Sequence, residues 1–371
     1  RVPGVADPKP FEHQRVSSEF FTLHNRCINL SDMGCVDAST EYLSPEGWVR
    51  IDQYAGGHVA QYHPDTGAIE FVPPTQYVKK PCPEMIRFKT SRGVDQLLSP
   101  EHRVLYVTAD GATAVQQAED VEARHHAAAY GFKGRFITTF GADPTRYGLA
   151  LTDAQLRLQV AVQADGHLPP AGKQVVMRLK RPRKIARLAE LLHAAGVPAK
   201  WRGQPSTGFA IVTFVPPLRL KTYDARYWSC TPEQLAVIAD ECGHWDGSAR
   251  KAGATEFFST NKCDADFIQY AFSASGRTAR ITEDARDGRN PVYTVHARPN
   301  AALLYLCGTN AGVKSETVWR EPSPDGFKYC FMVPSTFLLL RRNGCIFATG
   351  NTGKTKSAMW AADYLMQNRV V

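Results

Sequence analysis

The sequence has no pair of cysteines in Cys-x-x-Cys spacing, although nine cysteines occur among its 371 residues. An odd number without such pairs argues against a disulfide framework and a zinc finger, so we expect reduced thiols and a cytoplasmic location. No apolar run reaches the roughly 18–20 residues of a membrane-spanning helix, which predicts no membrane association. Acidic residues are the scarcer charge, 36 against 44 Lys and Arg, and the net charge of +8 favours a polyanionic partner such as nucleic acid.

The two ends of the chain each carry half of a phosphate-binding loop. Residues 352–358 read Thr-Gly-Lys-Thr-Lys-Ser-Ala and lack the strand and glycine that precede such a loop, whereas residues 28–34 read Ile-Asn-Leu-Ser-Asp-Met-Gly and supply them. Joined at Gly34 and Thr352, the segments resemble the nucleotide-binding (Walker A) motif of superfamily two helicases. The resemblance implies an ATP site in the joined product alone, held by Gln14, Gly353, Lys354 and Thr355.

The segment between these halves begins with Cys35 and ends with Asn351, followed by Thr352. Self-excision of a polypeptide requires these residue types: a thiol that attacks the preceding carbonyl, an amide that cyclises, and a hydroxyl that accepts the acyl group. With further motifs at 92–102, 327–334 and 343–351, the segment resembles an intein from end to end. The resemblance implies autocatalytic splicing without a cofactor, which excises 35–351 and joins Gly34 to Thr352.

Two internal motif residues receive roles from the same resemblance. Ser99 and His102 match the Ser/Thr-x-x-His pattern in which a hydroxyl and an imidazole polarise and protonate the scissile amide. Cys330 stands where many inteins have Asp, and one variant group uses a cysteine there as an acyl carrier. That group carries Trp where this chain has Val104, and it usually lacks the first cysteine. We therefore expect the direct route from Cys35, with Cys330 tuning or relaying the acyl group.

The C-terminal junction departs from the family pattern. Gly350 precedes Asn351, where the family more often has a His that helps the asparagine cyclise. The usual helper is therefore absent, and Thr349 is a candidate substitute.

The centre of the chain contains an internal repeat. Residues 187–200 align with residues 267–280, and Ala, Gly, Ala and a basic residue recur in register. An Asp-Gly pair precedes each copy, at 165–166 and 246–247. Small apolar helices that end in Asp-Gly predict two closely packed helices that deliver two carboxylates to one point.

Duplicated helix-Asp-Gly units resemble the LAGLIDADG homing endonucleases. The resemblance implies site-specific cleavage of double-stranded DNA, in which Asp165 and Asp246 hold Mg²⁺ and Lys262 offsets developing charge. The basic run 178–184 is a candidate for contacts with DNA phosphates, and a solvated loop is the alternative.

The resemblances together imply a domain organisation, with the whole chain a monomer. We expect helicase flanks at 1–34 and 352–371, an all-β Hint (horseshoe-like) splicing domain at 35–124 and 291–351, and an inserted α/β LAGLIDADG-type domain of two pseudo-symmetric repeats at 125–290. Short strand patterns on both sides of a helical centre agree with this division. Two alternatives stay open: a DNA-dependent ATPase that retains the insertion, and a splicing protein whose degenerate central domain only binds DNA.

Overall fold

The computed structural model of the chain describes residues 34–350 with short gaps at 91–92, 130, 205–207, 246, 250–252, 286–287, 289, 300–302, 307–308, 311–312 and 315–316. The predicted helicase flanks therefore lie outside the described residues, apart from Gly34. So do these predicted site residues: Gln14, Asp246, Asn351, Thr352, Gly353, Lys354 and Thr355.

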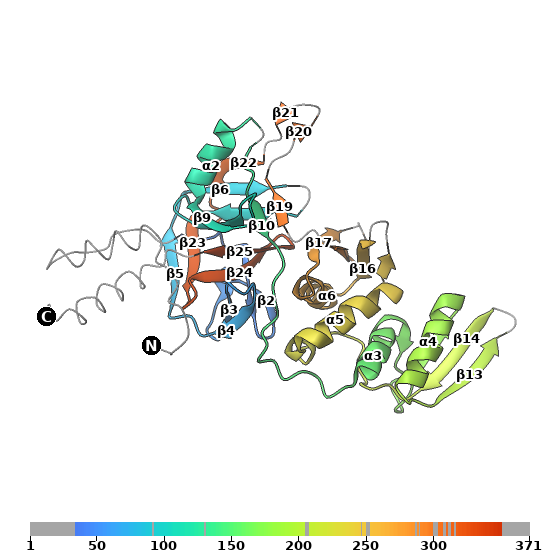
Figure 1. The fold of residues 1–371 in the computed structure, drawn as a ribbon. Coiled ribbons are helices and arrows are strands. Elements are labelled where there is room, and N and C mark those ends of the chain that lie inside the picture. The colour runs from blue at the N-terminus through green and yellow to red at the C-terminus, as the bar shows by residue number, and fades with distance from the viewer. Residues whose placement is uncertain are drawn as a thin grey trace.

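The β-rich part is built from strands that come from both sides of the centre (Figure 1). The late strands pair with the early ones: β22 with β6, β23 with β5, and β24 with both β1 and β3. Both sides of the centre are therefore needed to complete this part. Its elements are β1 (Glu41–Ser44), β2 (Gly47–Arg50), η1 (Ile51–Gln53), β3 (Val59–Tyr62), β4 (Ile69–Val72), β5 (Gln76–Pro81), β6 (Glu84–Lys89), β7 (Asp95–Leu98), β8 (Arg103–Val107), β9 (Thr113–Gln117), α2 (Ala118–Ala127), β10 (Arg135–Ile137), β19 (Leu303–Tyr305), β20 (Thr309–Asn310), β21 (Val313–Lys314), β22 (Val318–Pro322), β23 (Phe327–Met332), β24 (Phe337–Arg342) and β25 (Cys345–Gly350).

The last two strands form a hairpin whose register the sequence determines locally. Asn343 and Gly344 connect β24 to β25 with φ angles of 46° and 71°, the positive values that a two-residue hairpin turn requires. A Cβ at position 344 would collide with the carbonyl oxygen of Ile281, so the glycine also permits close approach of the central strand β17. The turn thereby sets which residues of β25 face the interior.

The centre is a duplicated unit, as the repeat predicted. Each copy runs helix, two strands, helix, two strands, and the strand orders are β11-β12-β14-β13 and β15-β16-β18-β17. The equivalent strands thus hold equivalent places, although the first set forms a sheet of its own and the second is one end of a 14-stranded sheet that continues through β25. The elements are α3 (Asp153–Asp165), β11 (Gly166–His167), β12 (Val175–Leu179), α4 (Pro182–Ala194), β13 (Ala199–Gln204), β14 (Phe209–Phe214), η2 (Tyr227–Ser229), α5 (Pro232–Glu241), η3 (Cys242–His244), β15 (Gly247–Ala249), β16 (Thr255–Ser259), α6 (Lys262–Ala274), β17 (Thr278–Asp284) and β18 (Val292–Arg298).

Helices α3 and α5 begin with the same local structure and pack against each other. Thr152 caps α3 and Thr231 caps α5, each in a reciprocal capping box with a glutamine three residues later. Arg157 of α3 donates to the buried Glu241 of α5 at 3.2 Å, and Arg187 of α4 donates to the same carboxylate. Burial alone would raise the pKa of Glu241, but the hydrogen bonds from Arg187 and Trp245 outweigh it and lower that pKa.

One buried arginine joins the centre to the β-rich part. Arg341 of β24 donates twice to Glu41 of β1, at 2.7 and 2.8 Å, and also to Asp266 (2.5 Å) and Gln269 (3.1 Å) of α6. Its guanidinium lies 4.7 Å from the centre of the Trp48 ring. The charge is buried but fully partnered, so removal of one partner would leave an expensive unpaired ion.

Strand pairing crosses both boundaries that were predicted for the central domain. β10 lies after residue 124 yet pairs with β8 and β19 of the β-rich part. β18 begins at Val292 yet pairs with β16 and β17 of the second repeat. The pairing partners decide these memberships, and short strand patterns alone do not reveal them.

Two large groups of buried hydrophobic side chains form the core. One runs from the β-rich part into the helices of both repeats, and the other surrounds the N-terminal junction and contains Cys35, Val36, Cys330 and Phe331. In Figure 1, α3 and α4 lie at one end of the molecule and the β-rich part at the other, with α5 and α6 between them. Within the described part of the chain, no helix combines the length and apolar character needed to cross a membrane.

Candidate functional site

Cys35 lies buried between two segments that fix its backbone. Its N–H donates to Ser99 Oγ at 3.0 Å, and its carbonyl oxygen accepts from the Ser99 N–H at 3.0 Å. One residue later, Val36 exchanges two 2.8 Å backbone hydrogen bonds with Tyr329 of β23. The structure therefore brings the predicted Ser99 to the nitrogen of the predicted scissile bond.

Gly34 packs directly on the residues that precede β8. A Cβ at this position would lie 2.5 Å from His102 Cα and 3.2 Å from both Arg103 N and Glu101 O. Side-chain carbons do not approach a backbone so closely, so only glycine fits here without a backbone shift. The Gly34–Cys35 bond is thereby held against the predicted His102.

His102 connects this junction to the last strand. Its Nε2 lies 2.6 Å from the Oγ1 of Thr349, on β25. Its Nδ1 makes no hydrogen bond within the described residues, but the backbones of Gly34 and Cys35 are near enough to favour the charged ring. Burial, and then the adjacent Arg103, outweigh that effect and lower the pKa of His102 to about 3. The imidazole is therefore neutral at physiological pH.

A second thiol lies beside Cys35. The hydrogen bond between Cys35 and Cys330, together with burial, raises the pKa of the Cys35 thiol far above its usual range. Both cysteines are almost fully buried, with exposed fractions of 0% and 2%. The Cys35 thiol is thus neutral at rest, and chemistry at Cys35 requires a group that removes its proton.

A lysine that the sequence reasoning did not single out lies close to this pair. Lys328 precedes Cys330 by two residues on β23, so the two side chains project from the same face of the strand. The Lys328 ammonium lies 2.5 Å from Glu101 Oε1 and is buried, with 3% of the residue exposed. Its positive charge opposes the rise in the Cys35 pKa, whereas Glu101 adds to it.

On the C-terminal side, β25 ends against β8. Gly350 pairs with Arg103, and Thr349 Oγ1 lies 3.3 Å from Arg103 O in addition to its contact with His102. A Cβ at position 350 would lie 3.0 Å from Phe337 Cε1 and 3.2 Å from Arg103 Cβ. A side chain at this position would therefore require Phe337 or Arg103 to shift by a few tenths of an ångström.

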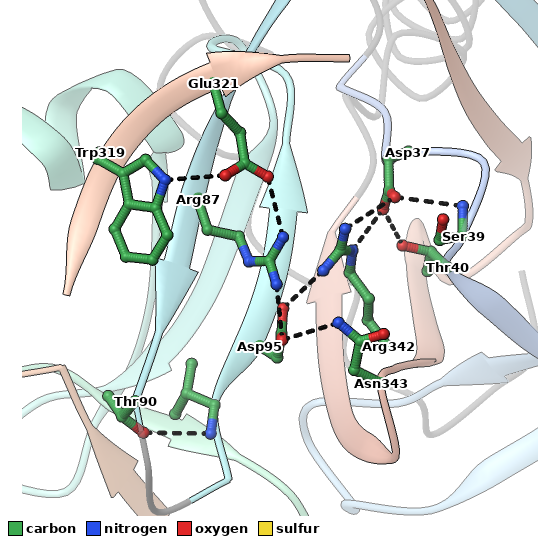
Figure 2. A network of polar contacts seen from close by, with 11 residues as sticks. Asp37, Ser39, Thr40, Arg87, Thr90, Asp95, Trp319, Glu321, Arg342 and Asn343 are labelled. Atoms are coloured by element: carbon green, nitrogen blue, oxygen red, sulfur yellow. Dashed lines mark hydrogen bonds and ion pairs between the residues drawn. The ribbon is translucent and has the colours of Figure 1, made fainter. Parts of the chain in front are cut away.

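A chain of buried charges holds the segment that contains Cys35 against β24 (Figure 2). Arg342 donates to both oxygens of Asp37, at 2.8 and 3.1 Å, and to Asp95 at 2.8 Å. Asp95 also accepts from Arg87 (2.8 Å), which donates to Glu321 at 2.9 Å. The network links the start of the β-rich part to the turn before β25, so both junction segments share one electrostatic support.

In the central domain, the predicted metal ligand Asp165 is engaged by an ammonium group. Asp165 ends α3, and its carboxylate lies 2.5 Å from the Nζ of Lys184 on α4. No group of three His, Cys, Asp or Glu side chains suited to a metal ion occurs among the described residues. The described donors therefore do not fit Mg²⁺ by themselves.

Lys262, the other predicted residue of the central domain, begins α6. Its ammonium pairs with Asp266 at 2.7 Å and lies 3.9 Å from Glu41 of β1. It thus belongs to the cluster that joins the centre to the β-rich part. Sequence reasoning missed Lys184 as the partner of Asp165, although the basic run 178–184 contains it. It also assigned no role to Arg103, which directly follows the predicted His102.

No family model and no curated protein matches the chain. Among solved structures, the N-terminal LAGLIDADG domain of DUF199/WhiA has a TM-score of 0.29 and 14% identity, covering 39% of this chain and 75% of that one. I-DmoI in complex with DNA and Ca has a TM-score of 0.29 and 13% identity, covering 40% and 85%. A GSH-linked, splice-inactive variant of the AceL NrdHF class 3 split intein has a TM-score of 0.30 and 10% identity, covering 86% and 98%. Similarities at these TM-scores do not establish the fold or the family of this chain.

Proposed function

We propose that residues 35–351 excise themselves by autocatalytic splicing and join Gly34 to Thr352, which restores a helicase-type phosphate loop. One observation carries the proposal: His102 lies against Gly34 and hydrogen-bonds Thr349. Residues near opposite ends of the segment therefore share one imidazole. This arrangement suits excision, which must act at both ends, whereas an insertion that an ATPase retains does not require it.

In the first step the Cys35 thiol attacks the Gly34 carbonyl, so that a C–S bond replaces the C–N bond and the nitrogen gains a proton. The Thr349 hydroxyl donates to Arg103 O and accepts from His102 Nε2–H, which leaves a lone pair on Nδ1. Nδ1 takes the thiol proton and returns it to the scissile nitrogen. Ser99 fixes that nitrogen through its hydrogen bond with the Cys35 N–H.

In the later steps the Thr352 hydroxyl accepts the acyl group. The side-chain amide of Asn351 then attacks its own carbonyl, which forms a succinimide and frees the Thr352 amine. A shift of the acyl group from oxygen to nitrogen completes the peptide bond, and no cofactor takes part. Because thiols are better nucleophiles than hydroxyls near neutral pH, the adjacent Cys330 supplies a physical route for relaying the acyl group.

Single substitutions in a precursor with tags on both flanks separate these steps. Asn351→Ala should block excision and leave a thioester that hydroxylamine cleaves after Gly34, whereas Cys35→Ala should abolish that cleavage. The mass of the trapped branch, attached to Cys330 or to Thr352, would identify the route. A precursor that stays whole under both conditions would contradict the proposal and favour a DNA-dependent ATPase with a retained insertion.

We further propose that the central domain, 125–290, binds double-stranded DNA and cleaves it at a specific site, with the chain acting as a monomer. The duplicated unit offers two sets of four strands in the same order, which suits an extended duplex. Arg178 and Arg202 occupy the same register on either side of Ile211, and Lys200 lies two residues from Arg202 on the same face. These exposed cations supply phosphate contacts.

The test uses the whole chain in its splicing-blocked Cys35→Ala form. Binding to a duplex that contains the uninterrupted phosphate-loop gene should weaken steeply with salt and with Arg178→Gln and Arg202→Gln together. Cleavage of the same duplex with Mg²⁺, lost in Asp165→Ala, would support the nuclease. Binding without cleavage would contradict the nuclease and support a degenerate domain that only binds DNA.

A further inference from the structure

Cys35 and Cys330 lie directly opposite each other on neighbouring extended segments. Val36 and Tyr329 pair antiparallel and exchange both of their backbone hydrogen bonds, each of 2.8 Å. This register places Cys35, which precedes Val36, opposite Cys330, which follows Tyr329. The N–H and the carbonyl oxygen of Cys35 both bond to Ser99 instead of to β23. The two cysteines therefore form the non-hydrogen-bonded kind of antiparallel pair.

Such a pair has the spacing that a disulfide needs. Its Cα atoms lie about 4.5 Å apart, and its side chains lie closer together than those of a hydrogen-bonded pair. Disulfides span Cα separations of about 4.4–6.8 Å. The side chains of Cys35 and Cys330 are hydrogen-bonded to each other, so the two sulfur atoms already face one another. A bond between these atoms is thus compatible with the backbone of the fold.

We propose that Cys35 and Cys330 form a reversible disulfide that stops splicing, with a low-molecular-weight disulfide as the oxidant. The inference rests on the splicing function proposed above, because Cys35 is the nucleophile of that reaction. Each protein thiol loses its hydrogen and a sulfur–sulfur bond forms between them, while the bond of the small disulfide breaks and yields two small thiols. Neither sulfur of the protein disulfide can then attack the Gly34 carbonyl, so no thioester forms.

Burial makes this exchange slow in both directions. The exposed fractions of Cys35 and Cys330 are 0% and 2%, and only a thiolate attacks a disulfide. The exchange therefore takes place during local opening of the chain, and the closed fold then shields the bond from reductants. In reducing surroundings the pair keeps its thiols and the segment can excise itself. In oxidising surroundings the precursor stays whole until a reductant returns.

The experiment uses the full chain with Asn351→Ala, which stops the reaction before excision. After incubation with oxidised glutathione and removal of the excess, we expect the chain to be lighter by two hydrogen atoms. Digestion without a reductant should give a pair of peptides linked through Cys35 and Cys330. The oxidised chain should lose the cleavage after Gly34 by hydroxylamine. A phosphine, which reduces disulfides without cleaving thioesters, should restore the rate measured before oxidation.

Two variants in the same background separate this disulfide from general oxidation of the chain. Cys330→Ala should keep its mass, and oxidised glutathione should leave that variant's own cleavage rate unchanged. Cys230→Ala removes a different cysteine with 0% exposure and should respond to the oxidant as the parent does. Urea denaturation verifies that each variant is folded. If Cys330→Ala does not fold, Cys330→Ser replaces it with the same expected result.

Four outcomes overturn the inference: an unchanged mass, a mixed disulfide or a link to another cysteine in place of the expected one, an oxidised parent that hydroxylamine cleaves at the reduced rate, or equal inhibition of Cys330→Ala. A reduced parent that hydroxylamine never cleaves would instead contradict the proposed splicing. The peptide map would still report whether the disulfide forms, so the two failures are distinguishable.

Discussion

The His102 imidazole and the Thr349 hydroxyl lie 2.6 Å apart although 247 residues separate them in the chain. His102 precedes β8 and Thr349 lies near the end of β25, so pairing of these two strands creates the contact. Because Gly34 packs on the backbone of the same histidine, this single contact links the two ends of the described chain. The consequences can be tested at each of the residues involved.

Substitution of Gly34 by alanine should slow thioester formation. The added Cβ would lie 2.5 Å from His102 Cα, so the Gly34–Cys35 bond must move away from the imidazole. Misplacement of reacting groups by about 1 Å costs roughly 100-fold in rate. The rate of hydroxylamine cleavage in an Asn351→Ala background measures the effect. Gly203→Ala, at a glycine with open space around it, is the matched control, and equal rates in both variants would contradict the close packing.

Replacement of Thr349 by valine removes a hydroxyl while it keeps the shape of the side chain. His102 Nε2 would then be buried without its partner, and an unsatisfied buried group costs about 1–3 kcal/mol. We expect at least a roughly tenfold slower thioester step, because the imidazole loses the tautomer that the hydroxyl fixes. Thr349→Ser restores the hydroxyl and should recover most of the rate. Normal kinetics in the valine variant would show that the contact has no part in the reaction.

The buried His102 should make the fold less stable in acid. Its pKa falls from an ordinary value of 6.5 to about 3, so between these values the unfolded chain binds a proton that the folded chain does not. The free energy of unfolding is therefore undiminished by this group well above pH 6.5. It falls as the pH is lowered, by about 2 kcal/mol between pH 7 and pH 5.

Urea denaturation at both pH values checks this in the splicing-blocked Cys35→Ala, Asn351→Ala protein. The same protein with His102→Gln lacks the titrating group, so its stability should depend less on pH by that amount. An unchanged difference between the two pH values would mean that His102 does not remain neutral in the fold.

Removal of Arg342 should destabilise the β-rich part strongly. Arg342→Met leaves the buried carboxylates of Asp37 and Asp95 without their shared cation, and breaking a buried pair costs about 3–5 kcal/mol. The free energy of unfolding, measured in urea in the splicing-blocked background, gives the effect. Arg50→Met breaks an exposed pair with Asp52 and should cost less than about 1 kcal/mol. If both variants lost a similar amount of unfolding free energy, the buried network would not be a special source of stability.

The sequence motifs named residues that the structure brings together on the N-terminal side of the candidate site. Cys35, Ser99 and His102 meet because a short motif places the serine and the histidine at the turn before β8, next to the segment that begins the β-rich part. The Asn-Gly turn before β25 was likewise predictable, since positive φ angles favour those residue types locally. Both the motif and the turn are determined by residues that are close together in the sequence, so the sequence alone reveals them.

The rest of the candidate site depends on contacts between elements that are separate in the chain. The contacts of Arg103 with Phe337, of Lys328 with Glu101 and of Lys184 with Asp165 each join separate elements, and no local pattern encodes them. The predicted edges of the central domain met a similar difficulty, because β10 pairs with strands of the β-rich part, whereas β18 pairs with strands of the second repeat. The ligand set for Mg²⁺ stays a prediction, since Asp246 lies outside the described residues.

The most direct measurement of the central claim is the mass and fragment sequence of the peptide that spans the joined flanks after the whole chain has been expressed with a tag at each end. The account predicts one product in which Gly34 is linked to Thr352 by an ordinary peptide bond, released together with an intact 35–351 segment. It also predicts that Asn351→Ala abolishes this product. A single uncut mass after long incubation, identical for the parent and for Asn351→Ala, would contradict the account.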